Sequence, residues 1–260
     1  MLREGSLEDI SDGKLYGPTD MVRADTCGCK GCARCCEVMV DTILLSPLDV
    51  ANLCEALGKS FPELVEEGAL EVRIIDGLML PVLKGQPQTD EAGHPLRNAY
   101  GEELAPCPFL SEEKRCSVHA SRPDLCRLFP LGRFYPEDPG EAFSYFLQDQ
   151  QCDHPRVKTK IRKWIGPAAE EPYRKFLTDW HEIAAGMRRL SQEYLQSSAP
   201  ENASEGVTET PETLEARMRE GMERSLSVAQ RIFTLFYAPY TPGRFYEEFE
   251  QRRQSLLDLV

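Results

Sequence analysis

The chain has 260 residues, of which 41% are apolar and 28% charged, so it can bury the core of one or two domains. Its 30 Lys and Arg against 43 Asp and Glu give a net charge of −13, which argues against a protein that coats the phosphate backbone of nucleic acid. The longest apolar stretch, Leu78 to Leu83, is far shorter than the ~20 residues of a membrane span, and the first fourteen residues lack an apolar export signal, so we expect a soluble, cytoplasmic protein.

The first clear element is a short helix after Ser46. Ser46 is a suitable N-cap, Pro47 occupies the first helical position, Asp49 follows at the third, and Gly58 provides a stop. Ser60 and the acid three residues later repeat this capping pattern, which predicts a second short helix.

A hairpin and a second set of short elements follow. The segments LEVRII and LMLPVLK flank Asp76-Gly77, which is a strong hairpin signal. Residues 85–105 are expected to form a polar loop. Ser121, Pro123 and Asp124 begin another short helix that carries Cys126, and AFSYFLQ from Ala142 has the alternation and aromatic content of a strand.

Beyond Cys152 the apolar pattern becomes helical. From Tyr173 to Tyr194 apolar residues recur every three or four positions, which predicts a long amphipathic helix. The composition of residues 197–210 predicts a flexible linker, and two further helices follow, one beginning at Pro211 and the other carrying Phe245 and Phe249.

The ten cysteines are the outlier of the composition, and all of them lie in residues 1–152. A reducing cytosol keeps thiols free, so clustered cysteines indicate metal ligands or redox groups rather than disulfides. We therefore predict an α+β fold. Residues 1–152 would be a small cysteine-rich metal-binding domain with short helices and a hairpin, and residues 153–260 an α-helical region.

Eight cysteines form the candidate metal-binding set. A CxxCxxCC run is joined by three cysteines between residues 107 and 126 and by one more after the predicted strand; the eight are Cys29, Cys32, Cys35, Cys36, Cys107, Cys116, Cys126 and Cys152. Thiolates select zinc, copper(I) or iron–sulfur clusters. The CxxCxxC spacing is that of three ligands of a [4Fe–4S] cluster, whereas structural zinc usually takes two separated Cys pairs, so an iron–sulfur cluster and zinc both stay open.

Helix geometry bears on how the eight ligands are shared. Neighbouring side chains leave a helix about 100° apart, so we expect Cys35 and Cys36 to face different centres. Two sites that share the eight cysteines fit this expectation best.

The same residues resemble the YkgJ-type cysteine-cluster family. The resemblance covers about residues 27–152 and rests on CKGCARCC, on CPFL at Cys107, on RCSVHASRPDLCRLFP from Arg115, and on the late Cys152. It implies a zinc- or iron-chelating domain that is often described as an iron–sulfur protein. The flagellin lysine-N-methylases look similar, which implies S-adenosylmethionine and a protein lysine as alternative substrates.

Other candidates have simpler interpretations. We expect Cys54 to lie in the protein core, on the apolar face of its helix. We expect Cys27 to be a surface-loop thiol, and His119 and His154 to be exposed histidines. The basic run RVKTKIRK from Arg156, followed by Trp164, could meet RNA or an acidic protein, but we expect it to be a solvated helix face.

No catalytic motif points to a reaction, so enzyme status stays open. The leading hypothesis is a protein that binds an iron–sulfur cluster or zinc. The alternatives are the methylase that the resemblance implies and a zinc-stabilised scaffold that binds a protein partner through its C-terminal helices. An exposed apolar patch on residues 168–260 would indicate the scaffold.

Overall fold

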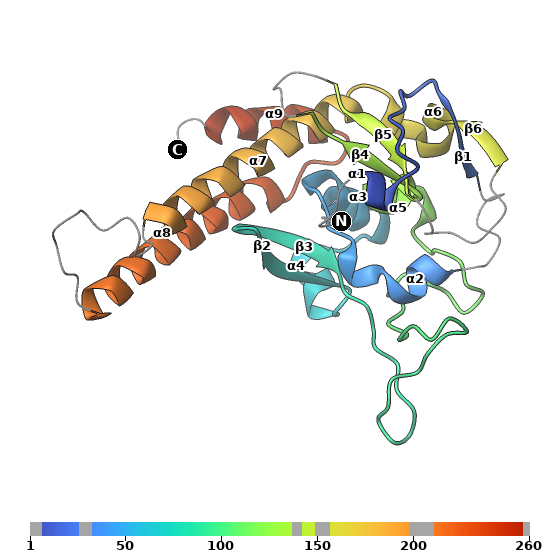
Figure 1. Cartoon of the computed structure of the whole chain (residues 1–260), viewed down its shortest axis with the longest axis horizontal. Coiled ribbons are helices and arrows are strands. Elements are labelled where there is room, and N and C mark those ends of the chain that lie inside the picture. Colours follow the sequence, from blue (N-terminus) through green and yellow to red (C-terminus); the bar gives the residue numbers. More distant parts are fainter. Residues whose placement is uncertain (1–6, 26–32, 137–141, 149–156, 198–210, 257–260) are drawn as a thin grey trace. The chain divides into compact units, whose positions relative to one another are not determined.

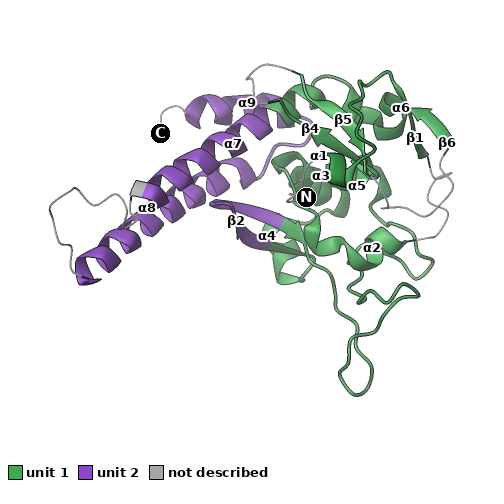
Figure 2. Ribbon diagram, viewed as in Figure 1, with its two compact units in different colours: residues 1–71, 82–178 green, residues 72–81, 179–260 purple. Residues whose placement is uncertain are grey.

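A computed structural model of the chain describes residues 7–25, 33–136, 142–148, 157–197 and 211–256 (Figure 1). By packing, the chain divides into two compact units (Figure 2). Unit 1 comprises residues 1–71 and 82–178, and unit 2 comprises residues 72–81 and 179–260.

The described residues form an α+β structure, as predicted, in which every strand precedes the long C-terminal helices. No described helix has both the length and the apolar composition that a bilayer crossing requires. In chain order the elements are α1 (Leu7–Ile10), β1 (Met21–Asp25), α2 (Arg34–Val38), the 3-10 turn η1 (Val40–Thr42), α3 (Pro47–Leu57), α4 (Phe61–Glu66), β2 (Leu70–Ile75), β3 (Leu78–Leu83), η2 (His119–Ser121), α5 (Asp124–Leu128), β4 (Leu131–Phe134), β5 (Ser144–Leu147), β6 (Val157–Lys160), α6 (Ile161–Ile165), η3 (Gly166–Ala169), α7 (Tyr173–Ser197), α8 (Pro211–Tyr237) and α9 (Phe245–Leu256).

Helices α3 and α4 begin where the sequence predicts. The Asp49 N–H donates to Ser46 Oγ (3.2 Å), and the Ser46 N–H donates to the Asp49 carboxylate (2.8 Å), which completes a capping box. Gly58 ends α3 in the left-handed region, with φ at 62°. Ser60 and Glu63 form the same box at the start of α4, so both predicted helix starts are confirmed.

The strands of the described residues form two-stranded sheets. Strands β2 and β3 form the predicted hairpin, and both turn residues, Asp76 and Gly77, have positive φ (51° and 76°). Strand β5, predicted from AFSYFLQ, pairs antiparallel with β4. At the Gly132–Phe146 pair the aromatic ring covers the glycine so closely that a Cβ on Gly132 would lie 2.1 Å from it.

The basic run that begins at Arg156 differs from the expected helix face. Its residues 157–160 form β6, which pairs antiparallel with β1, and the short helix α6 follows. Thr159 is buried opposite Val22, whereas Lys158 and Lys160 are exposed, so the run alternates as a strand does. The expectation of a helix is wrong for this segment because pairing with a strand far away in the chain overrides the local pattern.

Unit 2 is built on the predicted helices and is stabilised by aromatic packing. Trp180 of α7 lies edge-on to Phe236 and Tyr237 of α8, with ring centroids 5.5 and 6.0 Å apart. Phe236 also lies 5.4 Å from Phe249 of α9 and is fully buried. Apolar burial of this kind is the main source of stability for such helices.

The tip of the β2–β3 hairpin belongs to unit 2, where it packs tightly on α7. A Cβ on Gly77 would lie 2.0 Å from Ser191 Oγ, so only glycine fits this approach. Ser191 Oγ lies 2.7 Å from Ser225 Oγ of α8, and Arg188 forms an ion pair with Asp76 of the turn (3.6 Å). The turn is therefore held by both steric fit and charge.

The predicted domain boundary at residue 152 and most of the predicted linker at 197–210 lie outside the described residues, on 149–156 and 198–210. Both stay predictions.

Candidate metal centre

Two adjacent cysteines lie on the short helix α2. The N–H groups of Cys36 and Glu37 donate to the carbonyl of Ala33, which has a positive φ of 52°. Cys35 Sγ and Cys36 Sγ lie 3.9 Å apart. Two thiolates on one tetrahedral zinc, at zinc–sulfur distances of about 2.3 Å, are about 3.8 Å apart. The two side chains therefore turn toward each other, contrary to expectation, because their rotamers compensate for the angular offset along the helix.

Backbone pairing brings Cys107 to α2. The Cys107 N–H donates to the Cys36 carbonyl (2.7 Å), and the Ala105 N–H donates to the Glu37 carbonyl (2.8 Å). Residues 85–105, which precede this contact, form a loop as predicted, but its two sides pair with each other through backbone hydrogen bonds. This pairing explains how thiols distant in sequence become neighbours.

A tight loop returns the chain from Cys107 to Cys116. The Leu110 N–H donates to the Cys107 carbonyl (2.9 Å), and Leu110 then pairs with Cys116 in an isolated β-bridge. Lys114, which turns the loop with a φ of 57°, forms an ion pair with Glu37 of α2 (3.0 Å). The loop is thus fastened at its turn to the helix that carries the first two thiols.

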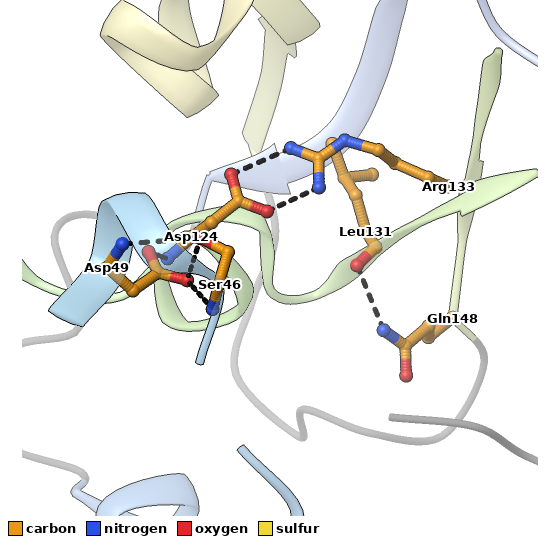
Figure 3. A network of polar contacts seen from close by, with 6 residues as sticks. All are labelled: Ser46, Asp49, Asp124, Leu131, Arg133 and Gln148. Carbon is orange, nitrogen blue, oxygen red and sulfur yellow. Dashed lines mark hydrogen bonds and ion pairs between the residues drawn. The ribbon is translucent and has the colours of Figure 1, made fainter. Parts of the chain in front are cut away.

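Cys126 lies on α5, and buried polar side chains hold the start of this helix (Figure 3). The Asp124 N–H donates to Asp49 Oδ1 (2.8 Å), while the Asp124 carboxylate accepts two hydrogen bonds from the Arg133 guanidinium, one of them at 2.8 Å. Asp49 and Asp124 are only 2% and 4% exposed. We call Ser46, Asp49, Asp124 and Arg133 the buried polar network.

The strand pair beside this network leads toward the last predicted ligand. Arg133 lies on β4, and the Gln148 side chain at the end of β5 donates to the Leu131 carbonyl of β4 (2.9 Å), as Figure 3 shows. Gln148 is the last described residue before the segment that contains Cys152.

Within the described part of the chain, four buried or half-buried thiols influence one another's pKa, and we call Cys35, Cys107, Cys116 and Cys126 the thiol cluster. Burial raises the pKa of Cys107 to about 11, and the Cys116 and Cys35 thiols add to this rise. Burial raises the pKa of Cys126 well above its ordinary value, and the other three thiols raise it further. The pKa of Cys35 is raised first by its neighbour Cys36 and then by burial, and that of Cys116 is raised mainly by burial.

This electrostatic arrangement fits a metal that binds sulfur. Without a cation, each thiolate would place negative charge beside the other thiols, so the cluster resists deprotonation. A bound metal supplies the compensating charge, and thiolate ligands select zinc, copper(I) or iron–sulfur clusters. Within the described residues, no three Cys, His, Asp or Glu side chains are close enough together to hold a metal ion. The described thiols therefore do not complete a site by themselves.

Some predicted ligands and candidates lie outside the described residues: Cys29, Cys32 and Cys152, together with Cys27 and His154. The two segments that contain them join the described chain at Asp25 and Val157, which are partners in the β1–β6 ladder. The ladder therefore places Asp25 and Val157 beside each other.

Cys54 and His119 stand apart from the thiol cluster. Cys54 is half-buried on α3 rather than fully in the core, and its pKa is raised by burial and then by Glu63, with no contribution from the other described cysteines. His119 is exposed, as expected, with Nε2 2.6 Å from an Arg122 guanidinium nitrogen. Burial, followed by Arg122 and Arg127, lowers its pKa.

The sequence does not predict the buried polar network. Asp49 is recognisable only as part of a capping box, and Asp124 only as a residue at a helix start. Their contact joins positions 75 residues apart, which no local pattern reveals. The only available signal is that an acid stands at the start of each of two predicted helices near cysteines.

Comparison with known proteins agrees with the chemistry of this region. The family model "CxxCxxCC: Putative zinc- or iron-chelating domain" matches residues 28–153, a range that includes all eight predicted ligands. No curated protein and no solved structure matches the chain significantly. The family match supports chelation of zinc or iron by this part of the chain.

Proposed function

Because residues 28–153 match the CxxCxxCC family of zinc- or iron-chelating domains, we propose that they form a metal centre that holds an iron–sulfur cluster, with zinc as the alternative. The thiol cluster is the observation that supports this proposal best. Its thiols belong to α2, to the loop from Cys107 to Cys116 and to α5, and burial together with neighbouring thiols raises the pKa of Cys107 and of Cys126. A cluster of soft donors from separate segments is typical of metal binding rather than of disulfide formation.

The proposed ligands are the eight cysteines Cys29, Cys32, Cys35, Cys36, Cys107, Cys116, Cys126 and Cys152. Three of them, Cys29, Cys32 and Cys35, have the CxxCxxC spacing that provides three ligands of a [4Fe–4S] cluster when a fourth is remote in sequence. Eight thiolates are enough for two centres. Such centres stabilise the fold, transfer electrons, or do both.

The identity of the bound metal distinguishes an iron–sulfur centre from a zinc centre. Protein made with iron supplied and purified without oxygen should be brown, with a broad absorbance near roughly 400 nm that fades on reduction, because thiolate-to-iron charge transfer produces this band. Iron, acid-labile sulfide and zinc should be quantified in the same sample, since zinc binds readily to vacated thiolates. Colourless protein that holds stoichiometric zinc would contradict the iron–sulfur assignment and leave a zinc-stabilised domain.

A second candidate function, binding of a protein partner, is supported by an apolar stripe on α8. Met218, Met222 and Leu226 are spaced by four residues and are 47%, 62% and 38% exposed. Exposed apolar side chains in such a row favour contact with another surface. Sedimentation of the full chain with and without Met222→Lys measures whether this surface associates with a second copy.

The methylase alternative predicts a saturable affinity for S-adenosylmethionine. Calorimetric titration of the metal-loaded protein measures that affinity directly. Absence of binding would remove this alternative without affecting the metal centre.

A further inference from the structure

One buried carboxylate, that of Asp49, accepts hydrogen bonds at the starts of two helices (Figure 3). Its Oδ2 accepts from the Ser46 N–H (2.8 Å) and from Ser46 Oγ (2.7 Å), which caps α3. Its Oδ1 accepts from the N–H of Asp124 (2.8 Å), and Asp124 is the first residue of α5. Asp49 therefore connects the well-formed helix α3 to the five-residue helix that carries Cys126.

Helix α5 has no side-chain cap of its own. The residue before it is Pro123, which makes no side-chain hydrogen bond to the helix start. The first N–H groups of a helix have no partner within the helix, and a buried N–H that lacks any partner is unfavourable. Asp49, 75 positions earlier in the chain, supplies the acceptor that α5 lacks.

The first residue of α5 is held from two sides. Asp49 holds its main-chain N–H, and Arg133 of β4 holds its side chain through a bidentate ion pair. Cys126 follows only two residues later, in the middle of a helix that has little more than one turn. The direction in which Cys126 leaves the backbone therefore depends on how the start of α5 is fixed.

The geometry connects Asp49 to this one ligand. Its Oδ1 holds the first residue of α5, and Cys126 is the cysteine that this helix carries. Any effect of Asp49 on the thiol cluster should therefore act through Cys126.

We propose that Asp49 is a positioning residue of the metal centre, which orients Cys126 toward the other thiols by accepting the Asp124 N–H. This inference rests on the proposed function, because it assumes that Cys126 binds a metal. Residues that orient a metal ligand through a hydrogen bond typically alter metal affinity 10–100-fold when they are replaced. An effect of this size can be separated from a general loss of stability by testing which ligand it depends on.

The test is a double-mutant cycle with cobalt(II), whose thiolate complexes are coloured, in competition with a chelator. Asp49→Ala should weaken cobalt binding about 10–100-fold in the parent chain and equally in a Cys107→Ser background. In a Cys126→Ser background the same substitution should change the affinity less than about threefold, since the ligand through which it acts is already absent. The thiolate-to-cobalt band of Asp49→Ala at saturation should also be weaker than that of the parent.

Ser60→Ala is the matched control, because it weakens the same kind of capping box at the start of α4 but removes no hydrogen bond of Asp49. It should lower the melting temperature yet keep the parent's cobalt affinity. If Asp49→Ala does not fold, Asp49→Asn replaces it in the cycle. Its single amide oxygen can serve α3 or α5 but not both, so a smaller loss with the same dependence on Cys126 is expected.

The outcomes separate the inference from the function on which it rests. A parent chain that binds no cobalt through thiolates would contradict both. Cobalt binding by the parent with an equal loss in the Cys107→Ser and Cys126→Ser backgrounds would contradict only the positioning role of Asp49. A loss of affinity in Ser60→Ala as large as in Asp49→Ala would contradict it as well, because the effect would then be one of general stability.

Discussion

The thiol-cluster region of unit 1 and the helices of unit 2 are stabilised by different forces. The four cysteines of the thiol cluster lie on five-residue helices and in a tight loop, and the side chains of Asp49, Asp124 and Arg133 in the buried polar network are almost fully buried. In unit 2, α8 runs for 27 residues and packs against its neighbours through aromatic rings around Phe236. Buried charge is prominent in the first region and buried apolar area in the second.

The two tryptophans of the chain allow this comparison to be measured. Trp164 belongs to unit 1, where its indole N–H donates to the Phe129 carbonyl (3.1 Å), and Trp180 belongs to unit 2, where it packs on Phe236. Single-tryptophan chains, carrying Trp180→Phe or Trp164→Phe, should therefore report unfolding of one unit each.

The largest expected effect is that of metal removal. A structural zinc site contributes an apparent ~10–16 kcal/mol to folding, so a strong chelator should abolish the structure around its ligands. In hydrogen exchange measured by mass spectrometry, peptides from residues 107–128 should lose protection, while those from α8 should keep it. Equal loss in both would show that unit 2 also depends on the metal, and no loss in either would show that the short helices are stable without it.

Removal of the buried arginine should have the next largest effect. Arg133→Met leaves the Asp124 charge buried without its partner and should cost about 3–5 kcal/mol of unfolding free energy, read from Trp164 fluorescence in denaturant. Phe236→Ala should cost a similar ~3–5 kcal/mol, read from Trp180, through lost apolar burial.

A second substitution shows whether the loss in Arg133→Met comes from the unpaired Asp124 charge or from lost packing of the arginine. Asp124→Asn added to Arg133→Met removes the buried charge and should recover part of the loss. If the double variant is no more stable than Arg133→Met alone, the arginine stabilises the fold through packing. The contrast between the two regions is then weaker than proposed.

The hairpin turn offers a smaller test within unit 2. Gly77→Ala would place a methyl group 2.0 Å from Ser191 Oγ at a backbone φ of 76°, so a loss of about 1–3 kcal/mol is expected from Trp180 unfolding. Adding Ser191→Gly opens space and should recover the steric part of this loss. A neutral Gly77→Ala would mean that the turn does not press on α7.

The smallest expected effect is a pH dependence of unit 2. Burial, followed by Arg188, lowers the pKa of His181, so its proton is bound more weakly in the folded chain than in the unfolded chain. Stability from this group is therefore complete above the unfolded pKa of about 6.5 and is lost as the pH falls below it. Denaturation followed by Trp180 between pH 7.5 and pH 5 should show this decline, and His181→Gln should reduce it.

Sequence patterns predicted the elements whose signals are local. The capping box at Ser46, the turn at Asp76-Gly77 and the periodic apolar residues from Tyr173 all gave elements that the structure contains. The pairing of β1 with β6 could not be predicted, because the basic run looks helical until Thr159 is placed opposite Val22. Long-range contacts of this kind carry no period in the sequence.

The features of the candidate site also divide into those that the sequence predicts and those that depend on contacts in the folded chain. Residue type and spacing predict the eight cysteine ligands, and this assignment stays a prediction. The contact between Cys35 and Cys36 depends on rotamers, and the bond from Asp124 to Asp49 depends on how α3 and α5 meet. Neither can be read from residue order.

The central claim is that the thiol cluster is the metal centre, and the pair Cys126→Ser and Cys54→Ala tests it most directly. Cys126 belongs to the cluster, whereas Cys54 is a half-buried thiol on α3 whose pKa is raised by burial and then by Glu63, not by another described cysteine. Metal per chain, measured on protein purified without oxygen, should fall clearly in Cys126→Ser and stay at the parent level in Cys54→Ala. Equal losses in the two variants, or full metal content in Cys126→Ser, would contradict the claim.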